Sequence, residues 1–234
     1  MKAAILAAGL GERLQQVGIA TPKPLLPVAG KALIDHTLAG VVAAGLTTVA
    51  GIVNEIHDGV EEHCRQRWPE LRFEWVRRTT PSSMESLFAL APLLDEPFLL
   101  LTVDAIVAPD VLAEFVAMSR LRWPAADGVL ALTSFVDDEK PLWVRRREDG
   151  RLIELGADAA GSDWITSGFY LFRPTIFAEI EAARCQRFTA LRQFLGHLLA
   201  RGCDLRGAVV GKTVDVDRPE DVATAEAFIA AGYR

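Results

Sequence analysis

Two hydrophobic patterns alternate along the chain. Short apolar runs typical of buried strands span residues 2–6, 48–53, 71–76, 97–103, 128–133, 164–172 and 205–210. Apolar residues recur at helical spacing over residues 32–44, 56–67, 87–94, 109–119, 175–183 and 189–200, and Pro219 begins a further helix. This alternation predicts an α/β fold: a Rossmann-like, mixed but mostly parallel sheet with helices on both faces.

Residues 135–156 interrupt the alternation with many charged side chains. A turn at Asp149-Gly150 separates two short strand-like segments, which predicts a small antiparallel flap beside the ligand crevice. Three consecutive arginines, Arg145 to Arg147, lie on the first segment, and at most one or two of them can face a ligand because side chains alternate along a strand. The alternative is a solvated, charged edge that discourages strand pairing.

Composition narrows the possible partners. The chain has 234 residues, 50% of them hydrophobic, and a net charge of −6, which argues against a general nucleic-acid-binding protein. The longest apolar runs are far shorter than the roughly 20 residues that span a bilayer. The three cysteines form no CxxC pair, so neither a disulfide framework nor a zinc site is indicated. We expect a soluble, cytoplasmic protein without a membrane partner.

A loop of small residues follows the first predicted strand. After Leu6 the chain reads Ala7-Ala8-Gly9-Leu10-Gly11-Glu12-Arg13. Small side chains and glycines at positive φ allow backbone N–H groups to surround an anion, with Arg13 at the rim. A plain strand-to-helix turn is the alternative, since the third glycine of a dinucleotide-binding motif is missing.

A lysine between two prolines lies ten residues further on. Pro22 and Pro24 restrict the backbone around Lys23, which aims its ammonium group and lowers the entropy cost of binding. The string from Met1 to Asp35, MKAAILAAGLGERLQQVGIATPKPLLPVAGKALID, resembles the N-terminal signature of the sugar-nucleotide pyrophosphorylases. These nucleotidyltransferases join an NTP to a phosphorylated small molecule. The overall spacing is most similar to short cytidylyltransferases acting on inositol phosphate or phosphocholine, and to short sugar-1-phosphate enzymes.

The resemblance implies a nucleotide site in the first half of the chain. It assigns the nucleotide to residues 1–134 and the acceptor to residues 135–234 of a single domain, 1–234. Ser82 and Ser83 match a loop that contacts the base in relatives, although either serine can instead cap the following helix. The implied nucleotide-binding residues are Leu6, Ala7, Ala8, Gly9, Gly11, Arg13, Lys23, Ser82 and Ser83.

Acidic residues in two distant segments are candidate Mg²⁺ ligands. Asp104 follows the most apolar run of the chain, at the tip of a predicted central strand. Relatives place a second metal-binding carboxylate near the C-terminus, aligned with Asp215 or with Asp217, and we favour Asp215. Capping is the alternative for both segments: Asp104 before the helix near Pro109, and Asp217 before the helix that begins at Pro219.

The acceptor region departs from the family pattern. Relatives carry a phosphate-binding lysine shortly after the segment equivalent to residues 151–156, where this chain has Ala157 and Asp158. Arg145 or Lys140 is expected to replace that lysine. The strand at residues 164–172 has a central glycine, which suggests close approach of a ligand or of another backbone. Relatives have a similar glycine-aromatic strand facing the acceptor, so the resemblance implies Thr166 and Gly168 as further acceptor-binding residues.

Together these features predict a Mg²⁺-dependent nucleotidyltransferase that releases pyrophosphate, with Arg13, Lys23 and Asp104 as catalytic residues. CTP or UTP is the favoured nucleotide, and the acceptor is a sugar 1-phosphate, an inositol phosphate or a phosphocholine-like compound. A regulatory domain that binds nucleotide or sugar phosphate without catalysis is the alternative. The residues leave the base, the acceptor and the oligomeric state open.

Overall fold

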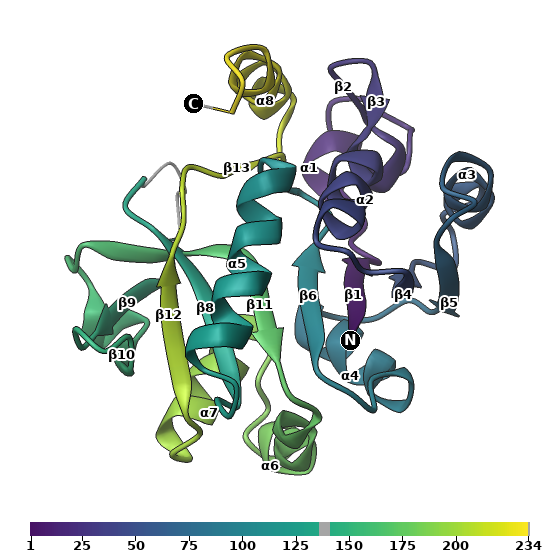
Figure 1. Ribbon diagram of the computed structural model, residues 1–234. Coiled ribbons are helices and arrows are strands. Elements are labelled where there is room, and N and C mark those ends of the chain that lie inside the picture. Colours follow the sequence, from purple (N-terminus) through teal and green to yellow (C-terminus); the bar gives the residue numbers. More distant parts are fainter. Residues whose placement is uncertain (136–140, 234) are drawn as a thin grey trace.

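The computed structural model describes residues 1–135 and 141–233 and is built around one twisted sheet (Figure 1). The sheet runs in the order β10-β9-β11-β6-β1-β4-β5, and β8 pairs with both β11 and β12. Every strand predicted from the apolar runs is present. The strands are β1 Lys2–Ala7, β4 Thr48–Val53, β5 Arg72–Arg77, β6 Phe98–Thr102, β8 Gly128–Thr133, β9 Trp143–Arg146, β10 Leu152–Leu155, β11 Trp164–Phe172 and β12 Leu205–Val209.

Strand directions divide the sheet into two parts. Strands β6, β1, β4 and β5 are mutually parallel, whereas β11 runs antiparallel to β6, β8 and β9. The predicted flap is the antiparallel pair β9–β10, which joins the sheet through β11. The predicted mixed, mostly parallel sheet with an antiparallel flap is confirmed.

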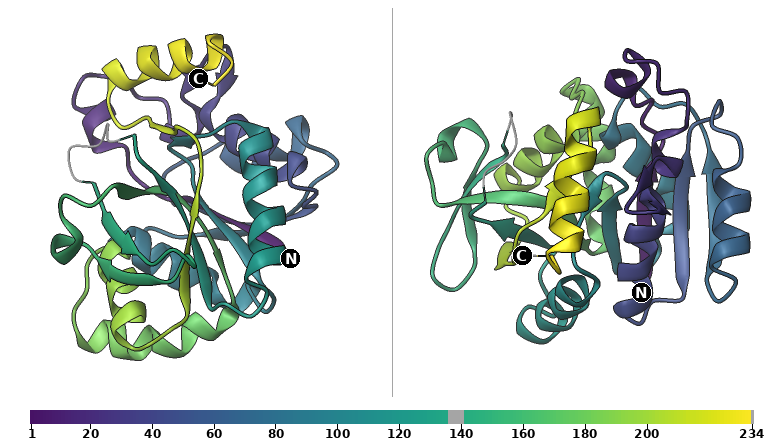
Figure 2. Two further views of the ribbon diagram at one scale, coloured as in Figure 1. Left: turned by 60° about the vertical axis from the view of Figure 1, so that its left-hand side comes forward. Right: turned by 90° about the horizontal axis from the view of Figure 1, so that it is seen from above.

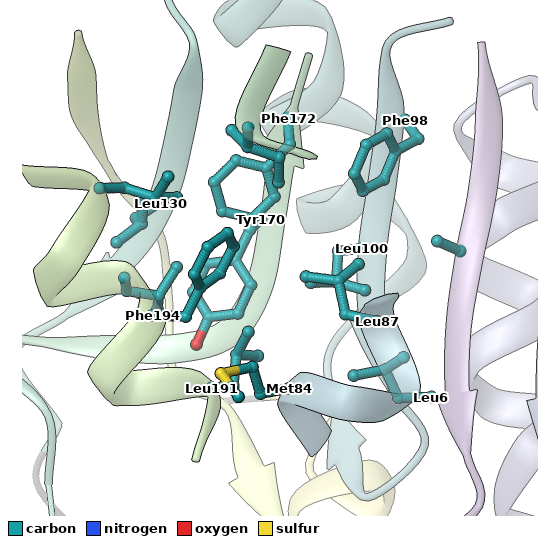
Figure 3. Close-up of a cluster of buried hydrophobic side chains, with 14 of the residues drawn as sticks. Leu6, Met84, Leu87, Phe98, Leu100, Leu130, Tyr170, Phe172, Leu191 and Phe194 are labelled. Carbon is teal, nitrogen blue, oxygen red and sulfur yellow. The ribbon is translucent and has the colours of Figure 1, made fainter. Parts of the chain in front are cut away.

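Helices cover both faces of the sheet and bury two separate clusters. Alternate residues of β1 point to opposite faces, so Ile5 packs with one cluster and Leu6 with the other. Figure 3 shows the Leu6 cluster, in which side chains of α4 and α7 meet the strands. The first face is covered by α2 Leu33–Ala43, α3 Val60–Arg67 and α5 Pro109–Arg122, and the second by α4 Ser83–Leu90, α6 Ile180–Cys185 and α7 Leu191–Ala200.

A third apolar cluster lies beyond the carboxyl ends of β1 and β6. It joins Leu14, Ile106, Val214 and Phe228, which come from distant parts of the chain. Figure 1 shows α1, β13 and α8 gathered at this end, and Figure 2 shows α8 over the middle of the molecule when seen from above. The short elements here are α1 Glu12–Gln15, the 3₁₀ turn Lys23–Leu25, β2 Pro27–Val28, β3 Lys31–Ala32, β7 Ala105–Ile106, β13 Val214–Asp215 and the helix α8 Pro219–Ala230.

Several predicted helix boundaries are wrong, for local reasons. Helix α4 begins at Ser83 and not at residue 87, because the hydroxyl of Ser82 accepts the N–H of Glu85 and caps the helix. Helix α3 begins at Val60 and not at residue 56, because Gly59, at φ 83°, sets its start. The helix predicted at 175–183 is a 3₁₀ segment, Pro174–Glu179, followed by α6. Among the described residues, no helix has the length and apolar character to cross a bilayer.

Candidate active site

The glycine loop forms one wall of a pocket of about 400 Å³. Gly11 has φ 65° and caps α1, while Gly9 keeps an ordinary negative-φ backbone, so only one of the two glycines adopts the predicted conformation. A Cβ added at Gly9 would meet no atom within 4 Å, which leaves its backbone open to a ligand. We call this space the glycine-loop pocket; its lining includes Leu6, Ala8, Gly9, Gly11, Arg13, Lys23, Ser82, Ser83, Asp104 and Asp217.

Ala7 is the exception among the predicted loop residues. It is fully buried and packs on the opposite face of the sheet, with Ile5 and Val53. Because side chains alternate along β1, Leu6 and Ala8 point one way and Ala7 the other. The Ala7 side chain therefore takes no part in the described pocket lining, and a contact of this residue with a nucleotide would involve its backbone.

Lys23 joins the two acidic segments. Its side chain is 9% exposed, and its Nζ lies 2.8 Å from Oδ2 of Asp104 and 2.5 Å from Oδ1 of Asp217. Burial alone would lower the pKa of Lys23, but the charges of the two carboxylates outweigh it, and the pKa lies above its ordinary value. The lysine is therefore permanently charged at neutral pH, with its ammonium group held in the glycine-loop pocket.

Asp104 lies in the turn between β6 and β7, at the predicted strand tip. Its backbone carbonyl accepts the N–H of Val216 at 3.0 Å, and β7 pairs with β13 so that Ala105 faces Asp215. Burial raises the pKa of Asp104, but the charge of Lys23 outweighs it and lowers the pKa below its ordinary value. Asp104 does not cap the following helix, because Ala108 occupies that position in α5.

Asp217 contacts two cations at once. Besides Lys23, Nη1 of Arg13 lies 3.5 Å from its Oδ2. The predicted capping of α8 by Asp217 is wrong: Arg218 is the N-cap, and the carboxylate of Asp221 accepts the N–H groups of Asp217 and Arg218 at 2.8 and 2.7 Å. The structure therefore directs the Asp217 carboxylate to the cations and not to the helix.

The two predicted serines, Ser82 and Ser83, lie at the N-terminus of α4. Both line the glycine-loop pocket, and Ser82 also caps the helix, so the two alternatives hold together for this residue. Next to them, the hydroxyls of Thr80 and Ser86 are 2.6 Å apart. Ser82, Ser83 and Ser86 thus belong to the capped start of α4, and Thr80 lies just before it.

A second pocket of about 410 Å³ adjoins the first, and Arg13 and Asp217 line both. We call it the acceptor-side pocket. Thr166 of β11 lines it as predicted, together with Asp215 of β13. Its lining is Arg13, Phe135, Ile165, Thr166, Arg192, Thr213, Val214, Asp215, Asp217, Arg218, Glu220, Asp221 and Thr224.

Gly168 supports this wall without lining it, as far as the described pockets go. It lies at a register shift of β11 with φ 76°. A Cβ there would lie 3.2 Å from Cβ of Ala105 and 3.3 Å from Oγ1 of Thr102. The glycine thus marks close approach of the side chains of Ala105 and Thr102 and not of another backbone.

Arg145 is not where the acceptor prediction requires it. It is exposed on β9 and pairs with Glu154 of β10, and it lines neither pocket among the described residues. The side chain is solvated, but the alternative of an edge that discourages strand pairing is wrong, because β9 pairs with β10 on one side and with β11 on the other. Lys140, the other expected replacement, lies outside the described residues. Arg192 of α7 lines the acceptor-side pocket, and sequence reasoning missed it. The helix was predicted, but nothing in its sequence indicates that its first turn lies beside a pocket.

Comparison with known proteins identifies the family of the chain. Residues 3–197 match the MobA-like NTP transferase domain. The chain belongs to this family. Its predicted membership of a nucleotidyltransferase family and its predicted fold are thereby confirmed.

Two curated relatives are named for transferase or synthase reactions. The chain is 31% identical to the bifunctional IPC transferase and DIPP synthase of Rubrobacter xylanophilus, over 97% of this chain and 51% of that protein. It is also 31% identical to the CMP-5'-(3-aminopropyl)phosphonate synthase of Streptomyces rubellomurinus, over 76% of this chain and 29% of that one. The chain thus spans about half of the first relative and under a third of the second.

Solved structures resemble the fold at lower identity. The inositol-1-phosphate CTP transferase from T. maritima superposes with a TM-score of 0.83 at 20% identity, covering 100% of this chain and 97% of that one. At this identity the similarity shows the architecture. The site must therefore be interpreted from the residues of this chain.

Proposed function

We propose that this chain joins an NTP to a phosphorylated small molecule and releases pyrophosphate, with Mg²⁺ as its cofactor. The observation that carries the proposal is the contact of Lys23 with both Asp104 and Asp217 where the two pockets adjoin. The nucleotide is assigned to residues 1–134 and the glycine-loop pocket. The acceptor is assigned to the second half, residues 135–234, of the same domain and to the acceptor-side pocket.

The acidic residues fit a hard divalent cation. Asp104 directly precedes β7, and Asp215 is the last residue of β13, where it pairs with Ala105 of β7. Carboxylate oxygens are typical Mg²⁺ ligands. Among the described residues no group of three or more His, Cys, Asp or Glu side chains could hold a metal. Mg²⁺ usually keeps waters and takes further ligands from substrate phosphates, so two carboxylates suffice. We assign Asp104 and Asp215 to the metal and Asp217 to the orientation of Lys23 and Arg13.

The reaction is an in-line displacement at the α-phosphorus of the NTP. An acceptor phosphate oxygen forms the new P–O bond, the bond to the β-phosphate oxygen breaks, and pyrophosphate leaves with the electron pair. A phosphate monoester is already anionic at neutral pH, so no side chain has to remove a proton. When bound, Mg²⁺ would neutralise negative charge on the reacting phosphates.

The side chains of this chain supply positioning and positive charge. Lys23 is assigned to the charge that develops at the α-phosphate, since its ammonium group is buried and fixed by two carboxylates. Arg13 is assigned to the β- and γ-phosphates, beside the backbone of Gly9 and Gly11. Ser82 and Ser83 are placed to contact the base or the ribose.

CTP or UTP is the proposed nucleotide. CTP is supported by the names of two similar proteins, the CMP-5'-(3-aminopropyl)phosphonate synthase and the inositol-1-phosphate CTP transferase. A sugar 1-phosphate, an inositol phosphate or a phosphocholine-like compound is the proposed acceptor. These substrates are small and soluble, so the reaction requires neither a nucleic acid nor a membrane. We propose that it takes place in the cytoplasm.

Pyrophosphate release tests the proposal. Each of the four NTPs is mixed with Mg²⁺ and with inositol 1-phosphate, phosphocholine, glucose 1-phosphate or mannose 1-phosphate, with and without protein. We expect release with at least one pair and loss of release in the Lys23→Ala variant. Nucleotide binding by calorimetry without release in any combination would overturn the proposal and favour a regulatory binding domain.

A further inference from the structure

Asn54 lies directly after β4, between the glycine loop and the segment that leads into α4. Strand β4 pairs with β1 on one side and with β5 on the other, and all three run parallel (Figure 1). The paired register ends with Val53 between Ala7 and Arg77, so Asn54 is the first residue beyond it. A side chain at this position can reach the glycine loop, which follows β1, and the segment that follows β5.

The side-chain amide of Asn54 forms hydrogen bonds at both of its ends. Its Nδ2 donates to the backbone carbonyl of Ala8 at 3.0 Å. Its Oδ1 accepts the N–H of Ile56 at 3.2 Å and the hydroxyl of Thr79 at 3.1 Å. Because a carbonyl can only accept and an N–H can only donate, these partners fix which end of the amide faces Ala8. Asn54 is fully buried, and its three bonds join the loops that follow β1, β4 and β5.

The bond to Ala8 orients the peptide group that leads into Gly9. This peptide bond is trans, so the carbonyl of Ala8 and the N–H of Gly9 point to opposite sides. Asn54 holds the carbonyl towards the buried interior, whereas Gly9 lines the glycine-loop pocket. The N–H of Gly9 is therefore presented to the pocket, where it can donate to an anion.

We propose that Asn54 is a positioning residue for the triphosphate of the NTP: it keeps the peptide between Ala8 and Gly9 turned so that the Gly9 N–H donates to a phosphate oxygen. This inference rests on the proposed function and adds to it a residue that does not touch the substrate. Without Asn54, the carbonyl of Ala8 loses its buried donor and is free to turn to the pocket, where its partial negative charge repels a phosphate.

The other end of the amide acts on the opposite wall of the same pocket. Thr79, which donates to Oδ1 of Asn54, directly precedes Thr80, and Thr80 lines the glycine-loop pocket beside Ser82. One buried side chain thus links the loop assigned to the phosphates with the segment assigned to the base or the ribose.

The Gly9 amide signal in ¹H–¹⁵N NMR spectra tests the proposal without turnover. Inorganic tripolyphosphate with Mg²⁺ is titrated into the wild-type protein, Asn54→Ala and Thr79→Val. In wild type, tripolyphosphate should move the Gly9 amide proton downfield, because an N–H that donates to an anion is deshielded. Asn54→Ala should lose this shift, and its Kd for tripolyphosphate should rise about tenfold or more.

Thr79→Val is the matched control, since it removes one bond to Asn54 and leaves Asn54 bonded to Ala8. It should keep the Gly9 shift and a tripolyphosphate Kd within about twofold of wild type, whereas a general loosening of the loops would weaken both variants alike. In pyrophosphate release, Asn54→Ala should raise the KM for CTP about tenfold and leave the KM for the acceptor within about twofold.

An unshifted Gly9 amide in the wild-type protein, with or without binding of tripolyphosphate, would overturn the inference even if Asn54→Ala does not fold. So would a wild-type shift in Asn54→Ala, an equal loss of affinity in Thr79→Val, or an acceptor KM that rises as much as the KM for CTP. If the Gly9 shift depends on Asn54 but no pair of NTP and acceptor releases pyrophosphate, the proposed reaction fails while the positioning role of Asn54 stands.

Discussion

The ammonium nitrogen of Lys23 lies 2.8 Å from Oδ2 of Asp104, across a separation of 81 residues. The lysine comes from a turn fixed by two prolines and the aspartate from the tip of a buried strand. Neither segment can shift far, because one packs in the third apolar cluster and the other in the sheet. The ion pair is therefore set before any substrate binds.

Lys23→Met should lower turnover by about 10² or more, because a fixed charge of this kind stabilises the transition state by roughly 3–4 kcal/mol. It should also reduce the free energy of unfolding by about 1–3 kcal/mol, since Asp104 and Asp217 lose their shared counterion. Steady-state kinetics and urea unfolding measure the two effects. Adding Asp104→Asn should recover part of the stability and none of the turnover. Lys31→Met, at an exposed lysine of the same segment, is the control and should behave like wild type.

Asp215→Asn and Asp217→Asn should separate metal binding from lysine orientation. With Asp215 as a metal ligand, its variant should weaken Mn²⁺ binding to the protein–CTP complex by about tenfold or more, measured by electron paramagnetic resonance. Asp217→Asn should keep most of the Mn²⁺ affinity and still lower turnover, because Lys23 and Arg13 lose a partner. The reverse ranking of Mn²⁺ affinities would assign the metal to Asp217.

Gly168→Ala should destabilise the protein by about 1–3 kcal/mol. An alanine there must adopt φ 76° and place its Cβ against Thr102 and Ala105. Gly196 in α7 is the matched glycine, because a Cβ added there meets no atom within 4 Å. Gly196→Ala should stabilise the helix by about 0.5–1 kcal/mol. Equal effects of both substitutions in urea unfolding would contradict the structural role of Gly168.

His57 should make the protein less stable as the pH falls below about 6.5, the ordinary histidine pKa. It is 3% exposed, neither of its ring nitrogens has a partner among the described residues, and burial lowers its pKa. Below pH 6.5 the unfolded chain takes up a proton that the folded chain refuses, so unfolding becomes more favourable until the lowered folded pKa is reached. In urea unfolding at pH 5 to 8, His57→Leu should show a smaller loss than wild type. Parallel curves for both proteins would show that His57 makes no contribution.

Hydrophobic periodicity was sufficient to predict the order of strands and helices, because burial on one or both faces leaves a period in the sequence. It failed at helix starts such as those of α3 and α4, where a cap residue sets the boundary. It also missed β7 and β13, because strands of two residues are too short to show an alternation of hydrophobic and polar positions. Their antiparallel pairing is what places Asp215 beside the segment of Asp104.

The sequence alone determined the family, the small-residue loop at Gly9 to Arg13 and the constrained Lys23, since these depend on residue types close together along the chain. Only the tertiary structure decided that Asp217 shares Lys23 with Asp104, that Ala7 points into the core, and that Arg192 lines the acceptor-side pocket where Arg145 does not. The physical reason is that a pocket is formed by contacts between distant segments. Local sequence patterns report which face of an element is buried, but not which other element it meets.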